Sequence, residues 1–292
     1  MAPCLFRLML PDDTVGWARG GSADRAEELL PADFSLDAVL SGRSHDVGAA
    51  VLDPPGAGRP PEGSTAIAPI ESQEVWAAGV TYLRSRQARE SESGEDGSAY
   101  DRVYRAARPE LFHKAAGWRV RGPGEPIGVR ADSGWNVPEP ELVLCLSADM
   151  SVVGLTIGND VSSRSIEGEN TLYLPQAKTY DGSCAMGPCL VIAESPADGI
   201  GIRLTVVRGG VAVIDGQAST AQLKRSFGEL VSYLGRALSF PVGAFLFTGT
   251  GIVPPDDFTL EPGDLTRIEI DGLGTLENPV VRVGTHTPSA KS

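Results

Sequence analysis

Pro138-Glu139-Pro140-Glu141-Leu142-Val143-Leu144-Cys145-Leu146 joins two acids to a continuous apolar run. A short apolar run that begins next to proline is typical of a buried strand. Side chains alternate along a strand, so Glu139 and Glu141 lie on one face, and Pro140 keeps the backbone between them extended. Two carboxylates side by side repel each other unless a cation lies between them. The stretch therefore indicates a strand whose first residues could bind a cation.

A third acid, Asp160, ends the next strand-like run in Ile157-Gly158-Asn159-Asp160. If the two strands pair, Asp160 returns to the edge that carries Glu139 and Glu141. Three carboxylates without histidine or thiolate suit a hard divalent cation, Mg²⁺ before Mn²⁺ or Ca²⁺. The alternative is that the glutamates mark an exposed strand start and that Asp160 caps a turn.

The rest of the chain after residue 141 is rich in short β-type runs separated by Gly, Pro or Asp, which predicts a sheet-dominated α+β domain. Gly209-Gly210 between two runs predicts a hairpin, because glycine accepts the positive φ of a primed turn. Apolar residues from Leu223 to Leu238 recur at helical spacing and predict one amphipathic helix. The runs are 142–146, 152–157, 190–193, 202–207, 211–214, 245–247, 267–270 and 280–283.

The Pro/Gly-rich run from Asp53 to Gly63 is the best candidate for a domain boundary. We expect a small N-terminal α/β domain over residues 1–65 and a larger domain over residues 66–292. A polar stretch at residues 84–100 is either a mobile lid or a solvated surface loop.

Composition excludes several classes of protein. The 292 residues are 41% hydrophobic, which is enough for a full core, and their net charge of −13 argues against nucleic acid as a partner. No apolar run reaches the roughly 20 residues that span a bilayer, and the N-terminus lacks the pattern of a signal peptide, so we expect a cytoplasmic protein without a membrane partner. Dinucleotide-binding, P-loop and nucleophile-elbow motifs are absent from the sequence.

Two further segments carry residues suited to chemistry. Lys178 lies in a turn-rich piece and could donate a hydrogen bond to a developing enolate or act as a base; otherwise it is a surface lysine. Thr248-Gly249-Thr250-Gly251 follows a strand, and its amides and hydroxyls could hold a carboxylate, although a plain glycine turn explains it nearly as well.

Taken together, these motifs resemble the fumarylacetoacetate hydrolase superfamily in order and spacing, from about Ile70 to Val283. The resemblance implies a mixed β-sandwich roll with a small N-terminal domain, and a homodimer or higher homo-oligomer. The motifs are Pro-Glu-Pro-Glu at 138–141, Gly-Asn-Asp-Val-Ser-Ser-Arg at 158–164, Lys178, Thr-Gly-Thr at 248–250 and Glu-Pro-Gly-Asp at 261–264.

Within that superfamily, residues 100–104, 108–112 and 168–178 resemble the 2-keto-3-deoxy sugar acid dehydratases. This likeness implies a Mg²⁺-dependent lyase that removes water from a small 2-oxo acid through an enolate. It also implies a set of site residues: Glu139, Glu141 and Asp160 as metal ligands, Lys178 and Glu110 as catalytic groups, and Tyr82, Arg86 and Thr250 as substrate contacts.

Some positions depart from the superfamily pattern. Its hydrolases activate water with a histidine and a glutamate, where this chain has Ser85 and Ala88, and the loss of that base favours lyase chemistry over C–C bond hydrolysis. His113 replaces the usual phenylalanine of the dehydratases, and Ser165 replaces an aspartate. Acylpyruvate hydrolysis, oxaloacetate-type decarboxylation and 2-oxo acid isomerisation remain alternatives on the same scaffold. A non-catalytic protein that binds the same ligands is a further alternative.

Overall fold

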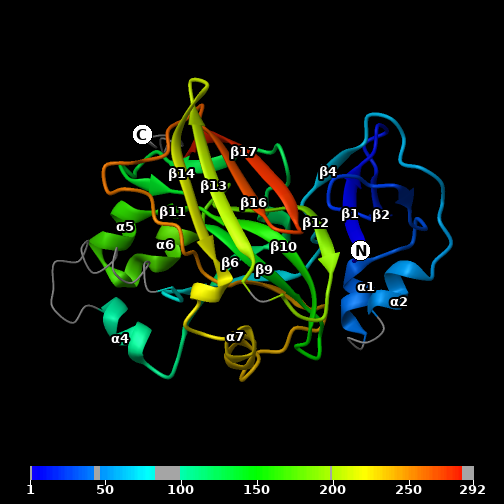
Figure 1. The fold of residues 1–292 in the computed structure, drawn as a ribbon, viewed down its shortest axis with the longest axis horizontal. Coiled ribbons are helices and arrows are strands. Elements are labelled where there is room, and N and C mark those ends of the chain that lie inside the picture. Colours follow the sequence, from blue (N-terminus) through cyan, green and yellow to red (C-terminus); the bar gives the residue numbers. More distant parts are fainter. Residues whose placement is uncertain (1, 43–46, 83–98, 198, 285–292) are drawn as a thin grey trace, which may run out of the picture.

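The computed structural model describes residues 2–42, 47–82, 99–197 and 199–284. Its largest sheet has ten strands, in the order β3-β2-β1-β12-β10-β9-β15-β5-β6, with β4 paired to β1 (Figure 1). Most neighbours are antiparallel, but β15 and β5 are parallel, so the sheet is mixed. The strands are β1 (Cys4–Met9), β2 (Val15–Gly20), β3 (Glu28–Leu29), β4 (Thr65–Ile67), β5 (Glu74–Gly79), β6 (Glu110–Ala116), β9 (Pro140–Leu146), β10 (Val152–Asp160), β12 (Cys184–Ile192) and β15 (Ala244–Phe247).

The central strands are buried on both faces, which explains their unbroken apolar runs. In β9, Leu142 and Leu144 pack into one hydrophobic cluster, and Val143 and Cys145 pack into a second. These two clusters lie on opposite faces of the strand because successive side chains alternate. The run that follows the two glutamates is therefore the centre of the molecule.

A second sheet of five strands covers one of these clusters, giving the sandwich-like arrangement in Figure 1. At its edge, Gly209 and Gly210 have φ angles of 56° and 83°, which confirms the predicted hairpin turn. Both the β-rich α+β class and the mixed sheets agree with the prediction. The strand order is β14 (Val211–Ser219), β13 (Gly201–Arg208), β16 (Leu265–Ile270), β17 (Gly274–Val283) and β7 (Ile127–Arg130).

Helices are short and lie around the sheets (Figure 1). Among the described residues, none of them combines the length and apolar character needed to cross a membrane. They are α1 (Leu36–Ser41), α2 (Val47–Leu52), α4 (Ala99–Arg105), α5 (Arg164–Glu169), α6 (Leu174–Lys178) and α7 (Phe227–Leu234), with single turns at η2 (Gly117–Arg119), η3 (Thr171–Tyr173) and η4 (Thr220–Gln222). Two further strands of two residues each, β8 (Asn136–Val137) and β11 (Ser162–Ser163), form a separate antiparallel sheet.

The amphipathic helix is shorter than its apolar pattern predicts. The Ser226 side chain caps the N-terminus of α7 by accepting a hydrogen bond from the Glu229 amide, and Gly235 ends the helix. Leu223 lies before the helix, where it forms a bridge with Tyr82, and Leu238 lies beyond its end and is exposed. The expectation of a helix from Leu223 to Leu238 was therefore wrong at both ends, because the caps override the periodicity.

The N-terminal strands extend the large sheet, because β1 pairs with β12 on one side and with β2 on the other. Strand β4 crosses the boundary predicted at residue 65 and pairs with β1. The division into residues 1–65 and 66–292 stays a prediction.

Candidate active site

The strand order brings the functional candidates to one end of the large sheet. Strand β9 is antiparallel to both β10 and β15, so its first residues lie beside the last residues of those two strands. Strand β5 is parallel to β15 and antiparallel to β6, so the end of β5 and the start of β6 reach the same edge. Segments far apart in the sequence thereby converge at the ends of these five strands.

Three carboxylates, those of Glu139, Glu141 and Asp160, meet at this end of the large sheet, which we call the carboxylate edge. The backbone amide of Asp160 donates to the carbonyl of Glu139 at 2.9 Å, and Glu141 lies opposite Gly158 in the antiparallel register. One oxygen from each of Glu139, Glu141 and Asp160 lies within 4.8 Å of the others, and the three residues are only 1–2% exposed. The structure thus brings together the three acids that the sequence predicted to share an edge.

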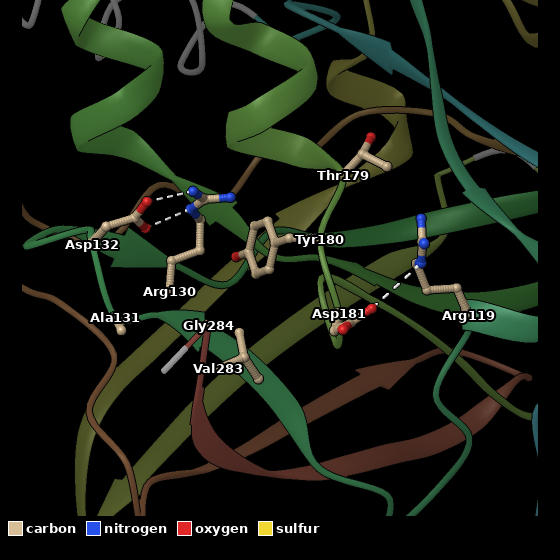
Figure 2. A pocket seen from close by; sticks show the side chains of 9 residues that line it. All are labelled: Arg119, Arg130, Ala131, Asp132, Thr179, Tyr180, Asp181, Val283 and Gly284. Atoms are coloured by element: carbon tan, nitrogen blue, oxygen red, sulfur yellow. Dashed lines mark hydrogen bonds and ion pairs between the residues drawn. The ribbon is translucent and has the colours of Figure 1, made fainter. Parts of the chain in front are cut away.

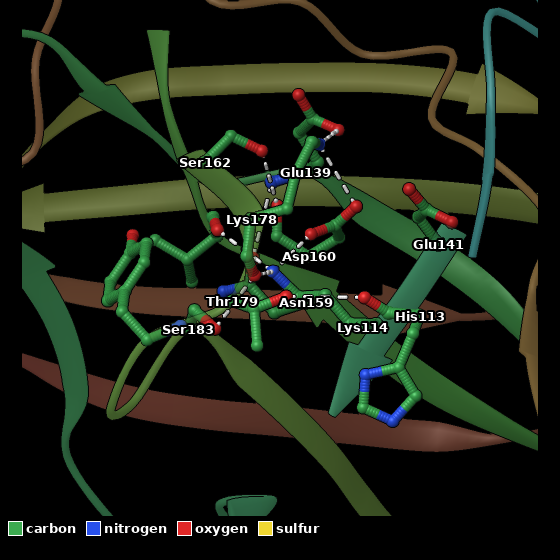
Figure 3. Close-up of polar contacts among 12 residues, drawn as sticks. His113, Lys114, Glu139, Glu141, Asn159, Asp160, Ser162, Lys178, Thr179 and Ser183 are labelled. Atoms are coloured by element: carbon green, nitrogen blue, oxygen red, sulfur yellow. Dashed lines mark hydrogen bonds and ion pairs between the residues drawn. The ribbon is translucent and has the colours of Figure 1, made fainter. Parts of the chain in front are cut away.

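Two cations from α5 and α6 face Glu139. The Lys178 ammonium lies 2.8 Å from Glu139 Oε2 and 3.0 Å from Asp160 Oδ2. The Arg164 guanidinium contacts the other oxygen of Glu139, Oε1, at 2.8 Å. Lys178 ends a short helix and is 1% exposed, so the alternative of a surface lysine was wrong. Figure 3 shows its side chain directed at Glu139 and Asp160.

Glu141 differs from the other two acids because in the described part of the chain it has no lysine or arginine within ion-pair distance. Its Oε2 accepts a hydrogen bond of 2.6 Å from the amide of Gly249. Burial, together with the negative charges of Asp160 and Glu139, holds the pKa of Glu141 well above its usual range. A divalent cation beside Glu141 would relieve this repulsion, so the donor set fits a hard metal ion.

Three other predicted residues within the described part of the chain, Tyr82, Glu110 and Thr250, lie at or just beyond the ends of β5, β6 and β15. Tyr82 is 1% exposed, and its hydroxyl has no hydrogen-bond partner among the described residues. Burial and the nearby charge of Glu141 raise the pKa of Tyr82. Thr250 is 4% exposed and donates to the carbonyl of Ile252 at 3.2 Å. Glu110 begins β6 and pairs with Gly79. Arg86, Ser85, Ala88 and residues 84–98 of the predicted lid lie outside the described residues.

Sequence reasoning missed two buried cations. Arg164 lies within a quoted motif and Lys114 lies four residues after Glu110, but neither was assigned a role. Lys114 is 0% exposed, and its ammonium lies 2.5 Å from Asp160 Oδ1. An apolar neighbourhood around a lysine, as in Phe112-His113-Lys114-Ala115-Ala116, is a weak signal of burial.

A cavity of about 470 Å³ is lined in part by residues 179–181, the segment that follows Lys178 (Figure 2). Arg130 and Arg119 line it, but they pair with Asp132 and Asp181 respectively. The paired charges leave no net attraction for an anion. Tyr180 lines this cavity, and burial raises its pKa, with smaller contributions from Asp160 and Glu139.

A family model for the C-terminal region of fumarylacetoacetate (FAA) hydrolase matches residues 74–281. The match covers more than half of the chain and all of the carboxylate edge. The chain therefore belongs to the fumarylacetoacetate hydrolase family.

Particular relatives within that family are dehydratases. The chain is 50% identical over 220 residues to a probable 2-keto-3-deoxyxylonate dehydratase of Haloferax volcanii, with 75% of each chain covered. It is 42% identical over 217 residues to 2-dehydro-3-deoxy-D-arabinonate dehydratase of Saccharolobus solfataricus, with 73% of each covered. A solved 2-keto-3-deoxy-D-arabinonate dehydratase complexed with magnesium and 2,5-dioxopentanoate has a TM-score of 0.81 and 32% identity, covering 96% of this chain and 99% of that one.

Proposed function

We propose that this protein is a Mg²⁺-dependent dehydratase that removes water from a 2-keto-3-deoxy sugar acid such as 2-dehydro-3-deoxy-D-arabinonate. The observation that carries the proposal is the buried cluster of Glu139, Glu141 and Asp160, two of which pair with Lys178. The two dehydratase relatives and the magnesium-complexed structure support it.

The metal ligands we assign are Glu139, Glu141 and Asp160. Their oxygens are hard donors in a site that excludes water, and Glu141 has a carboxylate for which the described residues supply no cation. When bound there, Mg²⁺ would polarise the ketone of a 2-oxo acid and acidify the protons at C3. The amide of Gly249 holds the Glu141 carboxylate in place through its hydrogen bond.

We assign the proton transfers to Glu110 and Lys178. The ammonium of Lys178 lies within ion-pair distance of two carboxylates, which places it to donate a hydrogen bond to the developing enolate oxygen. Glu110 would then take the C3 proton as general base. The electrons of the C3–H bond form the C2–C3 double bond of the enolate. The enolate then expels the C4 hydroxyl, which leaves as water after it gains the proton that Glu110 took from C3. For a five-carbon substrate, tautomerisation of the product gives 2,5-dioxopentanoate.

The geometry around Glu110 makes its role testable through Gly79. A Cβ at position 79 would lie 2.0 Å from Glu110 Oε2, so Gly79→Ala must displace that carboxylate. We expect kcat to fall by about 10- to 100-fold, because small displacements of a reacting group have effects of this size. Steady-state kinetics with a deoxypentonate provide the measurement.

Gly48→Ala is the matched control, since a Cβ there meets no atom within 4 Å. That variant should retain the activity of the wild type. If Gly79→Ala also keeps full activity, then Glu110 is not the base.

Tyr82 and Thr250 are proposed to contact the substrate, as is Arg86. Tyr82 and Thr250 follow strands that end at the carboxylate edge, and the Tyr82 hydroxyl, which has no hydrogen-bond partner among the described residues, lies near the charge of Glu141. A buried hydroxyl in this position suits a hydroxylated ligand, because it can both donate and accept a hydrogen bond. A homodimer or higher homo-oligomer and a cytoplasmic location stay predictions.

The rival reactions on this scaffold are acylpyruvate hydrolysis, oxaloacetate decarboxylation and isomerisation of a 2-oxo acid. A panel of 2-keto-3-deoxypentonates, acylpyruvates and oxaloacetate, analysed by mass spectrometry with Mg²⁺ or with chelator, separates them. We expect loss of one water from a deoxypentonate only when the metal is present. Cleavage or CO₂ loss from another substrate would overturn the dehydratase assignment, and binding without any turnover would favour a non-catalytic protein.

A further inference from the structure

Lys114 joins three parts of the site that are distant in sequence. It lies in β6, and its side chain is completely buried. Its ammonium forms an ion pair of 2.5 Å with Asp160 Oδ1 and donates to the carbonyls of Lys178 at 2.5 Å and Val161 at 3.1 Å. We propose that Lys114 is a positioning residue that sets the orientation of Asp160 for the metal and holds the backbone of Lys178. The proposal rests on the proposed function.

The first part of the argument is how the two oxygens of Asp160 are divided. Oδ1 contacts Lys114, whereas Oδ2 contacts Lys178 at 3.0 Å. Figure 3 shows the two ammonium groups approaching the carboxylate from different elements. With Oδ1 paired to Lys114 of β6 and Oδ2 paired to Lys178 of α6, the carboxylate of Asp160 is held from two sides. Lys114 therefore presents Oδ2 as the ligand atom.

The second part is the backbone of α6. The carbonyl of Lys178, the last residue of this helix, accepts hydrogen bonds from Lys114 and also from the Ser183 hydroxyl, at 3.0 Å. The Val161 carbonyl, one residue after Asp160, is held by the same ammonium. Lys114 thus links the end of β10 to the end of α6, because its ammonium donates to a carbonyl at each.

The third part is charge. The cluster holds three carboxylates, Glu139, Glu141 and Asp160, and three cations, Lys114, Lys178 and Arg164, all nearly inaccessible to water. A carboxylate that loses its cation attracts a metal ion more strongly, so the effect expected of Lys114 comes from orientation, because Asp160 is free to reorient once that partner is removed. Partners that orient metal ligands have effects of about 10- to 100-fold on metal affinity. We expect an effect of this size from Lys114, although it does not reach the substrate.

The test uses Lys114→Met and Lys114→Gln, with Mn²⁺ as the probe. Free Mn²⁺ is measured by electron paramagnetic resonance on the purified full-length chain without substrate. Both variants are expected to bind Mn²⁺ about 10- to 100-fold more weakly than the wild type. At saturating metal, kcat should remain reduced while KM changes little, because Lys178 is also displaced. The glutamine variant retains a hydrogen-bond donor, and it provides the Mn²⁺-binding test if the methionine variant does not fold.

Arg19→Met is the matched control. Arg19 likewise pairs with a carboxylate, Glu28, and donates to several carbonyls, but it lies in β2, far from β6 in the strand order. This variant should lose stability and keep the Mn²⁺ affinity of the wild type. A merely structural role for Lys114 would give the same result as Arg19→Met, and that outcome would overturn the proposal.

A second measurement needs no variant. In a crystal structure of the wild type with Mn²⁺, Asp160 should bind the metal through Oδ2 while Oδ1 stays with Lys114. Release of Lys114 from Asp160 in that complex would overturn the positioning role. If wild-type protein does not bind Mn²⁺ at all, the proposed function itself fails, which distinguishes the two failures.

Discussion

Replacement of Glu141 by glutamine is expected to abolish both Mg²⁺ binding and turnover. Glu141 is the carboxylate of the cluster to which the described residues bring no cation, so it contributes most directly to the attraction for a divalent ion. We expect kcat/KM to fall by more than about 10²- to 10³-fold, the usual effect of losing one preorganised electrostatic group. Isothermal titration with Mg²⁺ and steady-state kinetics measure the two effects.

The same variant should be more stable than the wild type when metal is absent. Because burial and neighbouring charges raise the folded-state pKa of Glu141, its ionised form opposes folding at neutral pH. A glutamine removes that charge and can still accept the hydrogen bond of the Gly249 amide. Thermal unfolding with chelator tests this, with the exposed Glu62→Gln as control. Retained Mg²⁺ binding by the Glu141 variant would contradict its role as a ligand.

Replacement of Lys178 by methionine is expected to lower kcat by about 10²- to 10⁴-fold, the range of a positioned proton donor or acceptor. Metal affinity in the absence of substrate should be kept or become tighter. The reason is that the Lys178 ammonium pairs with Glu139 and Asp160, and therefore competes with a metal ion for the same oxygens. A Mn²⁺ titration and rate measurements on one preparation separate the two effects. A rate equal to that of the wild type would remove Lys178 from the chemistry.

The carboxylate edge could be predicted from the sequence because its rules are local. Glu139 and Glu141 share a face through the period of a strand, and Asp160 follows from the pairing of adjacent strands. The cations could not be predicted in the same way. Lys114 reaches Asp160 from β6, and Arg164 reaches Glu139 from α5. Nothing in the sequence around either residue indicates which acid it meets, because tertiary packing decides the partner.

Secondary structure, too, could be predicted only in part from the sequence. The apolar runs of β9 and β15 form strands buried on both faces, whereas the helix predicted from Leu223 to Leu238 is cut short by Ser226 and Gly235. Lys178 was placed in a turn-rich piece, but it ends α6, a helix of five residues that begins with Leu174-Pro175. A proline in the first turn of a helix is favourable, so Pro175 was the signal for this element.

The most direct test of the central claim compares metal binding with metal activation on one substrate. Purified protein is stripped of metal, Mg²⁺ is added back in steps, and formation of 2,5-dioxopentanoate from 2-dehydro-3-deoxy-D-arabinonate is followed by nuclear magnetic resonance. We predict no product without metal, and a rate that saturates at the Mg²⁺ concentration that also saturates direct binding. A rate that is unchanged by chelator, or a product that retains the C4 hydroxyl, would contradict the account.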